Sequence, residues 1–567
     1  MLSVERLSVR LGGQAVVREA SLAVGRGEVV ALTGESGSGK SMTALAVMGL
    51  LPEGAEATGR VRLDGQDLIG LPERAMNRVR GGRVGMVFQE PMTALNPLQR
   101  IGDQVAEAAR LHGATRAEAR ARAREALARA ELPPDRFPPS RYPHELSGGQ
   151  RQRVGIAIAI AARAPLLIAD EPTTALDALT QAGILRLLRR LVDEEAMGLL
   201  LITHDLAVVA GIAHRIAVMR EGQVVEQGPA ARLLAERRHP YTRALLDASA
   251  HRPRRERRPL GGPLLEVEDA VREHRLPGPW LARRPRFRAV DGASLAVRAG
   301  ESVGLVGPSG CGKSTLARAI LGLDALQGGS VRLGGEPMTP RAPARLRRRV
   351  QAVFQDPYGS LNPRWRAGRI VAEPFHLDPG APRGEARRRA VAEALDAVGL
   401  PESAMDRHPH AFSGGQRQRL AIARALSIRP DLIVLDEAVS ALDVRVRARV
   451  LDLLADLQGR FGLAYLFISH DLSVVRAVTD RVLVMEAGRI VEEGPTEAVF
   501  AAPRHPLTRA LLDAAPRLPA APEPGPSAGG PGTGGPGTGG PSPPPAATEA
   551  GATEAGAPPP GRGSVSA

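Results

Sequence analysis

The sequence has little cysteine, few aromatic residues and no long apolar run. Its single cysteine, Cys311, excludes a disulfide framework and any metal or iron–sulfur site built from several cysteines of this chain. Aromatic residues make up only 3% of the sequence, so Leu, Val, Ile and Ala must fill the cores. No apolar run approaches the roughly 20 residues that span a bilayer. The longest candidate, residues 154–168, is interrupted by Arg163 and predicts a helix followed by a strand. Because the first residues also predict a strand rather than a charged and then apolar leader, we expect a cytoplasmic protein that reaches a membrane only through partners.

Lysine is also nearly absent, although the chain carries a net charge of +14. Lys40 and Lys313 are the only lysines, and arginine supplies every other basic side chain apart from the histidines. Arginine preserves positive charge but does not easily replace the compact ammonium group that a phosphate-binding loop uses. The two retained lysines therefore indicate two phosphate-binding loops.

Both lysines stand in a glycine-rich loop between an apolar strand and a helix. Each loop has two glycines separated by four residues and then Lys and Ser, which is the phosphate-loop pattern. Glycines let backbone N–H groups surround an anion, and the helix N-terminus adds positive charge. A plain glycine-rich turn is the alternative, which the recurrence of the full pattern disfavours. The predicted nucleotide-binding residues are Gly34, Glu35, Ser36, Gly37, Ser38, Gly39, Lys40 and Ser41, then Gly307, Pro308, Ser309, Gly310, Cys311, Gly312, Lys313, Ser314 and Thr315.

The two parts of the chain repeat one another. Gln89 and Gln355 are 266 residues apart (355 − 89), and the same separation relates Ser147 to Ser413, Asp170 to Asp436 and His204 to His470. A chain of 567 residues is too long for one core. We therefore expect two copies of one domain, the first half at residues 1–248 and the second half at residues 264–518.

Two segments fall outside the repeat. Residues 249–263 form an Arg- and Pro-rich linker without apolar periodicity, which predicts a solvated connector, with binding to anionic lipid headgroups as the alternative. Residues 519–567 are rich in Pro, Gly and Ala, cannot bury a core and predict a disordered tail.

Polar side chains follow buried strands in each half. Asp170 and Glu171 follow the apolar run 166–169, and His204 follows the run 199–203. Taken alone, an acidic pair is often a helix N-cap, and a lone histidine usually packs or caps. Because both features follow a phosphate loop and recur in the second half, we interpret Asp170 as a Mg²⁺ ligand and Glu171 as the group that polarises an attacking water.

This series of motifs resembles the ATP-binding cassette of ABC proteins, and the resemblance covers nearly the whole of both halves. The series comprises the phosphate loop, Gln89, the LSGGQ signature at 146–150, Asp170-Glu171, Asp177 and His204. The surrounding sequence is similar to the importer subfamily for dipeptides, oligopeptides, nickel and glutathione, in the stretches 87–97, 141–145, 239–246, 353–363 and 505–512.

The resemblance implies an α/β fold with two tandem P-loop NTPase domains. Each would have a RecA-like parallel-sheet core, an antiparallel β subdomain and a helical subdomain. The residue pattern agrees, since it predicts antiparallel strands at 2–11 and 15–24, buried strands at 84–88 and 199–203, and helix over 101–132 with Gly113 as its interior breaker.

The resemblance also implies a role for each motif in two composite ATP sites that both hydrolyse ATP. Glu171 and Glu437, His204 and His470, and Gln89 and Gln355 would be catalytic. Mg²⁺ would be held by Ser41, Gln89 and Asp170 in one site and by Ser314, Gln355 and Asp436 in the other. The signature of each half would cap the ATP of the other half, through Ser147, Gly148, Gly149 and Gln150 and through Ser413, Gly414, Gly415 and Gln416.

Three departures from the family pattern stand out. The aromatic residue that usually stacks on adenine is replaced by Leu11 in the first half and by His274 or Arg275 in the second, which predicts weak selectivity for ATP over GTP. The four-cysteine cluster of some relatives is absent, and the second signature begins with Phe412 instead of Leu.

We therefore expect the ATPase subunit of a peptide-type importer at the cytoplasmic face of the membrane. Its partners would be two membrane permease subunits and an extracytoplasmic solute-binding protein, with the two halves paired within one chain. Two alternatives are a soluble tandem-cassette factor acting on ribosomes or nucleic acid, which the positive charge could suit, and an exporter cassette. The short linker, the scattered arginines and the importer-like stretches favour the importer, with neither nucleic acid nor an iron–sulfur cluster as a partner.

Overall fold

The computed structural model describes residues 1–89, 94–174, 176–256, 259–275, 286–356, 358–440 and 442–518. The predicted disordered tail, 519–567, and parts of the importer-like stretches, 90–93 and 357, lie outside these residues. Both halves belong to one compact unit that includes residues Met1–Ala520.

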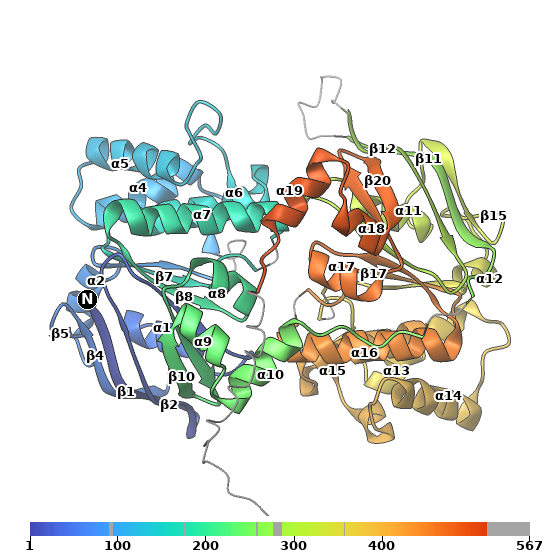
Figure 1. The fold of residues 1–567 in the computed structure, drawn as a ribbon, viewed down its shortest axis with the longest axis horizontal. Helices are drawn as coiled ribbons and strands as arrows, with labels where there is room; N and C mark the ends of the chain where they lie inside the picture. The colour runs from blue at the N-terminus through green and yellow to red at the C-terminus, as the bar shows by residue number, and fades with distance from the viewer. Residues whose placement is uncertain are drawn as a thin grey trace, which may run out of the picture. The chain divides into compact units, whose positions relative to one another are not determined.

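Within the described residues, each half folds into two sheets, as Figure 1 shows. The antiparallel sheet of the first half has the order β2(Gln14–Val24), β1(Leu2–Leu11), β4(Ala55–Leu63) and β5(Gln66–Asp67). Its second sheet is parallel from β9 to β6 with an antiparallel edge strand, in the order β10(Gln223–Pro229), β9(Arg215–Arg220), β3(Val29–Thr33), β8(Gly198–Thr203), β7(Leu166–Asp170) and β6(Val84–Val87).

The second half repeats both sheets. The antiparallel sheet is β12(Arg286–Arg298), β11(Pro263–Arg275), β14(Gly328–Leu333) and β15(Glu336–Pro337). The mixed sheet is β16(Val350–Val353), β17(Leu432–Asp436), β18(Ala464–Ile468), β13(Ser302–Val306), β19(Arg481–Glu486) and β20(Arg489–Pro495). The predicted antiparallel strands and parallel cores are therefore confirmed.

Helices connect and cover these strands. Those of the first half are α1(Lys40–Met48), α2(Glu73–Val79), α4(Ile101–Leu111), α5(Arg116–Arg129), η1(Pro143–Glu145), α6(Gly148–Ile160), α7(Ala178–Glu195), α8(Leu206–Ile212), α9(Ala230–Glu236) and α10(Pro240–Ser249). Those of the second half are α11(Lys313–Ile320), α12(Ala344–Arg347), α13(Ala367–Val371), η2(Glu373–Leu377), α14(Gly384–Ala397), η3(Glu402–Asp406), η4(Pro409–Ala411), α15(Gly414–Leu426), α16(Val444–Phe461), α17(Leu472–Val478), α18(Thr496–Ala501) and α19(Pro506–Ala514). No helix among the described residues combines the length and the apolar character that a membrane crossing requires.

Side chains that alternate in direction along the strands divide the core of the first half into layers. Leu167 and Ala169 of β7 pack with helices α4 to α7, whereas Leu166 and Ile168 pack with α1 and the antiparallel sheet. Successive side chains of a strand point to opposite faces, so a continuous apolar run is needed wherever both faces are covered. The run therefore ends only where the strand leaves the core, at Asp170.

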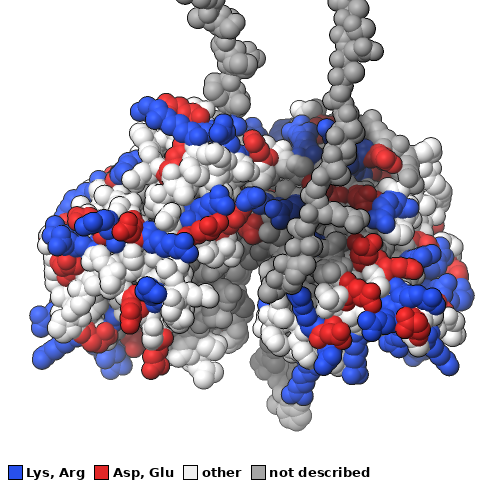
Figure 2. Space-filling view, turned by 90° about the horizontal axis from the view of Figure 1, so that it is seen from below, with Lys and Arg blue, Asp and Glu red and all other residues white. Residues whose placement is uncertain are grey.

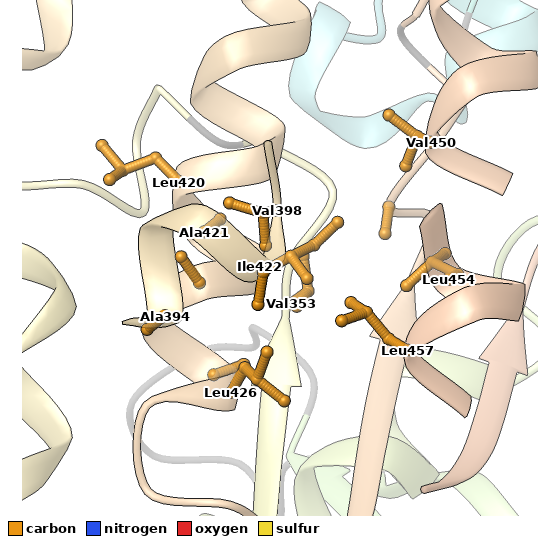
Figure 3. Close-up of a cluster of buried hydrophobic side chains, with 14 of the residues drawn as sticks. Val353, Ala394, Val398, Leu420, Ala421, Ile422, Leu426, Val450, Leu454 and Leu457 are labelled. Carbon is orange, nitrogen blue, oxygen red and sulfur yellow. The ribbon is translucent and has the colours of Figure 1, made fainter. Parts of the chain in front are cut away.

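A comparable cluster in the second half joins the signature helix to the mixed sheet. Figure 3 shows Ile422 of α15 beside Val353 of β16, with Leu454 and Leu457 of α16 across from them, and all four are buried. Burial of such side chains contributes about 1.5–3 kcal/mol each. The signature helix is thus fixed against the strand that leads to Gln355.

The helical prediction for residues 101–132 was too long. Helix α4 ends at Leu111, and α5 begins at Arg116 behind a capping box formed by Thr115 and Glu118. Gly113, with φ of +86°, occupies the turn between them. Gly113 therefore divides the segment into two helices, because glycine adopts this left-handed conformation without the cost of a Cβ, whereas Gly102 lies within the first turn of α4.

The linker prediction of a solvated connector holds for Arg254, which is exposed, but not for Arg255. Arg255 donates to Asp480 at 2.9 Å and to Gln458 at 3.2 Å, and its side chain is only 19% exposed. His251 lies 2.7 Å from Asp452. The linker is therefore held against the second half by charged contacts that composition alone did not indicate.

The surface charges are intermixed. Figure 2 shows Lys and Arg interspersed with Asp and Glu over the face in view. Many arginines pair with nearby acids, as Arg129 does with Glu195 and Arg489 with Asp291. On this face the positive excess is scattered, as the sequence predicted.

At Gly59 two backbone segments of the first antiparallel sheet lie unusually close together. It has φ of +98° opposite a bulge in β1, and a methyl group there would lie 2.3 Å from the Arg6 carbonyl oxygen. We expect Gly59→Ala to lower the free energy of unfolding by about 2–5 kcal/mol, since left-handed strain and a backbone clash add together. Urea unfolding followed by circular dichroism would measure this loss.

Gly65 is the matched control. It has φ of +84°, but nothing lies within 4 Å of the added methyl group, so Gly65→Ala should lose only about 1–2 kcal/mol. Equal losses for the two variants would mean that the close approach at Gly59 contributes nothing.

Candidate active site

Each phosphate loop holds its lysine in a buried position. Lys40 begins α1 and is only 5% exposed, and its Nζ donates to the carbonyl oxygens of Gly34 at 2.8 Å and Glu35 at 2.7 Å. Lys313 makes the matching contacts to Gly307 at 2.8 Å and Pro308 at 2.9 Å. Burial lowers the pKa of Lys40, although the nearby charges of Glu171 and Asp170 oppose that shift. Backbone carbonyl oxygens of each loop therefore hold the lysine ammonium group in place.

The first glycine of each loop cannot be replaced without moving the backbone. A Cβ on Gly34 would lie 2.1 Å from the Met219 carbonyl oxygen, and one on Gly307 would lie 2.2 Å from that of Met485. Both glycines have φ of +155°. The sheet strand next to β3 or β13 therefore limits this position to glycine, which lets the loop pass close to the sheet edge.

A hydroxyl and a carboxylate meet beside each lysine. Ser41 donates to Asp170 at 3.2 Å, and Ser314 donates to Asp436 at 3.4 Å. Burial raises the pKa of Asp170, and Ser41 partly offsets that shift. These oxygen donors suit Mg²⁺, which prefers hard oxygen ligands and a partly hydrated shell. Gln89 could complete the set through its Oε1, since its Nε2 donates elsewhere.

Glu171 is the centre of a polar network that joins three strand ends. It accepts from Gln89 at 3.0 Å and from Thr174 at 2.9 Å, and its Oε1 lies 3.1 Å from Nδ1 of His204. Burial alone would raise the pKa of Glu171, but the His204 ring, Thr174 and Lys40 together lower it to about 2. Glu171 is therefore ionised at neutral pH and is ready to accept hydrogen bonds.

The second half builds the same network with one change. Glu437 accepts from Gln355 at 2.7 Å and lies 3.4 Å from Nδ1 of His470. Burial would lower the pKa of His470, but the Glu437 carboxylate outweighs it and raises that pKa. Ser440, which matches Thr174, donates instead to the backbone oxygen of Glu437 at 2.8 Å.

Both glutamates adopt a strained backbone conformation. Glu171 has φ of +47° and Glu437 has φ of +50°, a region that residues with a Cβ rarely occupy. Such strain persists where surrounding contacts fix it, and it concentrates at functional sites. The sequence did not reveal Thr174 or this conformation, because both depend on the turn that follows the strand.

The signature residues cap their own helices. The Ser147 side chain accepts from the backbone of Gln150 at the start of α6, and Ser413 does the same with Gln416 at the start of α15. Ser147 and Ser413 are both exposed. Among the described residues, no hydrogen bond joins either serine to the phosphate loop of the other half, so the predicted capping of ATP across the halves stays a prediction.

The segments that follow the acidic pairs do reach across. Asp177, the N-cap of α7, accepts from the backbone N–H of Ser309 at 3.2 Å. Arg445, near the start of α16, donates to Glu35 at 2.9 Å. Each phosphate loop therefore contacts the opposite half, a relation that no single half of the sequence displays.

The two histidines also face one space. His204 and His470 line a single cavity of about 280 Å³, together with Arg447 and Asp471.

The positions proposed to replace the adenine-stacking aromatic lie at strand ends, Leu11 in β1 and Arg275 in β11. Their effect on nucleotide selectivity stays a prediction.

The motifs and geometry agree with a comparison against known proteins. The sequence model of the ABC transporter family matches residues 17–174 and 290–440, more than half of the chain. The chain belongs to the ABC transporter family. It is an ATP-binding, ATP-hydrolysing translocase subunit with two cassettes, as predicted. A second model, the C-terminal region of oligopeptide/dipeptide transporters, matches residues 225–274 and 491–531.

Curated relatives match over most of their length. The glutathione import ATP-binding protein GsiA of Escherichia coli O6:H1 is 45% identical over 562 residues, covering 91% of this chain and 89% of GsiA. The peptidoglycan transport ATP-binding protein YejF of Agrobacterium fabrum is 46% identical over 533 residues, covering 91% of this chain and 96% of YejF. Both comparisons extend over the two halves.

Glutamate to glutamine substitutions would separate nucleotide binding from hydrolysis. Glu171→Gln and Glu437→Gln keep the side-chain shape but remove the carboxylate that accepts a proton, so each should slow turnover at its own site by about 10²–10⁴-fold. Each single variant should retain about half of the activity if the sites turn over independently, and the double variant should have almost none. Steady-state phosphate release would measure turnover, and a fluorescent nucleotide would check that binding persists. Near-complete loss in either single variant would contradict independent sites.

Proposed function

We propose that this chain powers the import of small peptides or of glutathione-like solutes through separate permease subunits. The observation that carries the proposal is the oligopeptide/dipeptide transporter C-terminal region, which follows a complete set of ATP-site motifs in both halves. Relatives named for glutathione import and peptidoglycan transport support the same class of cargo. Nickel, which related importers carry, belongs to the same proposal.

The proposal places the chain at the cytoplasmic face of a membrane. Two integral-membrane permeases would hold it there, and an extracytoplasmic solute-binding protein would deliver the cargo. Cargo selection would belong to these partners, because the polar networks described above would be occupied by nucleotide.

The chemistry at each site would be hydrolysis of the terminal phosphate bond of ATP. The Lys40 ammonium would lie against the outer phosphates, where developing charge is stabilised. Glu171 would accept a hydrogen bond from the attacking water, and His204 would fix the orientation of that carboxylate. Mg²⁺, held by Ser41, Asp170 and Gln89, would neutralise phosphate charge when bound.

Two such sites would act as one switch. Glu171 and Glu437 lie in matching networks, and neither lacks its glutamine or histidine partner. A signature helix N-terminus from the opposite half would complete each site, since exposed N–H groups there favour an anion. ATP would draw the halves together, and loss of the terminal phosphate would release them.

Purification in detergent tests the proposed partners. Two integral-membrane proteins should be retained on the tagged full chain, and proteoliposomes with those permeases and the binding protein should accumulate labelled dipeptide or glutathione in an ATP-dependent manner. Retention of ribosomes or nucleic acid without membrane proteins would overturn the importer proposal. Uptake of nickel alone would change the cargo class.

Ser413→Arg tests the proposed capping across the halves. The long cationic side chain would block the N-terminus of α15, so turnover at the Lys40 site should fall by at least tenfold, while ATP binding there stays largely intact. Measuring in a Glu437→Gln background isolates that site. The matched control is Ser147→Arg, which should spare the Lys40 site in that background and impair the Lys313 site in a Glu171→Gln background. If Ser413→Arg leaves turnover at the Lys40 site unchanged, the head-to-tail arrangement is wrong.

A further inference from the structure

Three positions around the phosphate loops differ between the halves as a set. Glu35 of the first loop corresponds to Pro308 of the second. At the common separation of 266 residues, Tyr241 corresponds to Leu507 (507 − 241) and Leu179 to Arg445 (445 − 179). One site therefore gathers a carboxylate, a phenol and a guanidinium, whereas the other has three apolar residues at the matching positions.

The polar set converges on one residue of the first loop. The backbone N–H of Glu35 donates to the Tyr241 hydroxyl at 3.1 Å, and its carboxylate accepts from Arg445 at 2.9 Å. Its carbonyl oxygen also accepts from Lys40 at 2.7 Å. Glu35 thus joins the phosphate-loop lysine to α10 of its own half and to α16 of the opposite half.

Tyr241 is itself fixed in place. Its side chain is only 3% exposed, it packs with Leu245 of the same helix, and the Arg220 guanidinium lies 5.3 Å from the centre of its ring. Arg220 ends β9, next to Met219, whose carbonyl oxygen closely approaches Gly34. The hydroxyl that receives the Glu35 N–H is therefore held by the sheet as well as by α10.

The second loop has no chemistry for the same contacts. Pro308 lacks both an N–H and a charge, and Leu507 lacks a hydroxyl. Leu507 is buried in a cluster with Val306 and Leu472, and Leu179 of the first half packs against that cluster. The Leu179 contact across the halves is therefore apolar, although the neighbouring N–H of Ser309 donates to Asp177 of the first half at 3.2 Å. Neither set of three residues could form the contacts of the other set.

We infer that Arg445 is a positioning and specificity-determining residue of the first ATP site, which it reaches from the second half through Glu35. It holds the loop that carries Lys40 when the halves pair. The second loop is contacted across the halves through Asp177 and Ser309, but it has no counterpart of this ion pair. Association of the two halves therefore affects the two ATP sites differently. The inference rests on the proposed function in one respect, namely that both sites hydrolyse ATP.

The same pair favours association of unlike halves, by the modest amount expected of a partly exposed ion pair. Pairing of two first halves would place Glu35 against Leu179, and pairing of two second halves would place Arg445 against Pro308. Each arrangement leaves a partly buried charge without its partner, since both side chains are only about one-third exposed, 30% for Glu35 and 35% for Arg445. Unlike pairing, first half to second half, is the arrangement that satisfies both charges.

A double-mutant cycle on the full chain tests this inference. The variants are Glu35→Gln, Arg445→Leu and their combination, each in a Glu437→Gln background that isolates the first site. Each single change should raise KM for ATP and lower turnover by roughly two- to fivefold, as for a partly exposed ion pair. The double variant should be no worse than a single one, and the loss should shrink at high salt as screening weakens the intact pair.

Reversing both charges of the Glu35–Arg445 pair should restore activity. Glu35→Arg combined with Arg445→Glu should recover activity that either reversal alone removes, which a purely structural role for Arg445 would not produce. Arg460→Leu, which removes an exposed pair with Asp456 elsewhere in α16, is the control and should change neither KM nor the salt response. Additive losses in the cycle, or no rescue by the reversed pair, would overturn the inference, and circular dichroism verifies that each variant is folded.

A triple substitution would introduce the carboxylate, the phenol and the guanidinium of the first site at the second site. Pro308→Glu, Leu179→Arg and Leu507→Tyr together, in a Glu171→Gln background, should confer on the second site the salt dependence of the first. Failure of transport with any tested cargo, while the cycle still shows coupling, would refute the proposed importer and leave this inference standing. Absence of coupling in a chain that transports would refute only this inference.

Discussion

The structure depends on a backbone approach that only glycine permits. At Gly34 and Gly307 an added Cβ would lie 2.1 and 2.2 Å from a carbonyl oxygen of the adjacent strand. Because the loop passes so close to the sheet, its carbonyl oxygens turn inward and hold the lysine ammonium. A buried lysine without such partners would incur a large desolvation cost. The glycine, the strand and the lysine are therefore one unit, and the rest of each site is arranged around it.

Parallel strands bring the remaining groups to that unit. β6, β7 and β8 end near one edge of the sheet, so Gln89, Glu171 and His204 meet although they are far apart in the chain. The strands that lead to this edge are buried, and Glu171 has a left-handed backbone conformation while its carboxylate contacts three partners. Rigid placement of an ionised carboxylate beside a lysine is what the hydrolysis of a charged substrate needs, because the charges are set before the reaction begins.

Much of this arrangement could be predicted from residue types and spacing. Repeated motifs separated by 266 residues fixed the number of domains, and apolar runs ending in Asp170 or before His204 placed those residues at strand ends. Prediction failed where the geometry of a turn or a contact across the fold decides the outcome. Gly113 divides a segment that composition favoured as one helix, Arg255 pairs with Asp480, and Thr174 turns toward Glu171. Composition does not specify the backbone geometry of the turns at Gly113 and Thr174, and it contains no information about Asp480, which lies far from Arg255 in the chain.

The sequence by itself determined the two phosphate loops, the acidic pairs, the histidines and the tandem repeat, because these follow from which residues occur and at what spacing. The tertiary structure alone showed which sequence differences between the halves meet at one site. Glu35, Tyr241 and Arg445 are separated by about two hundred residues at each step, and each has an unremarkable local context. Only folding brings a backbone N–H, a phenol and a guanidinium to one residue, because hydrogen bonds and ion pairs require distances near 3 Å that chain order does not specify.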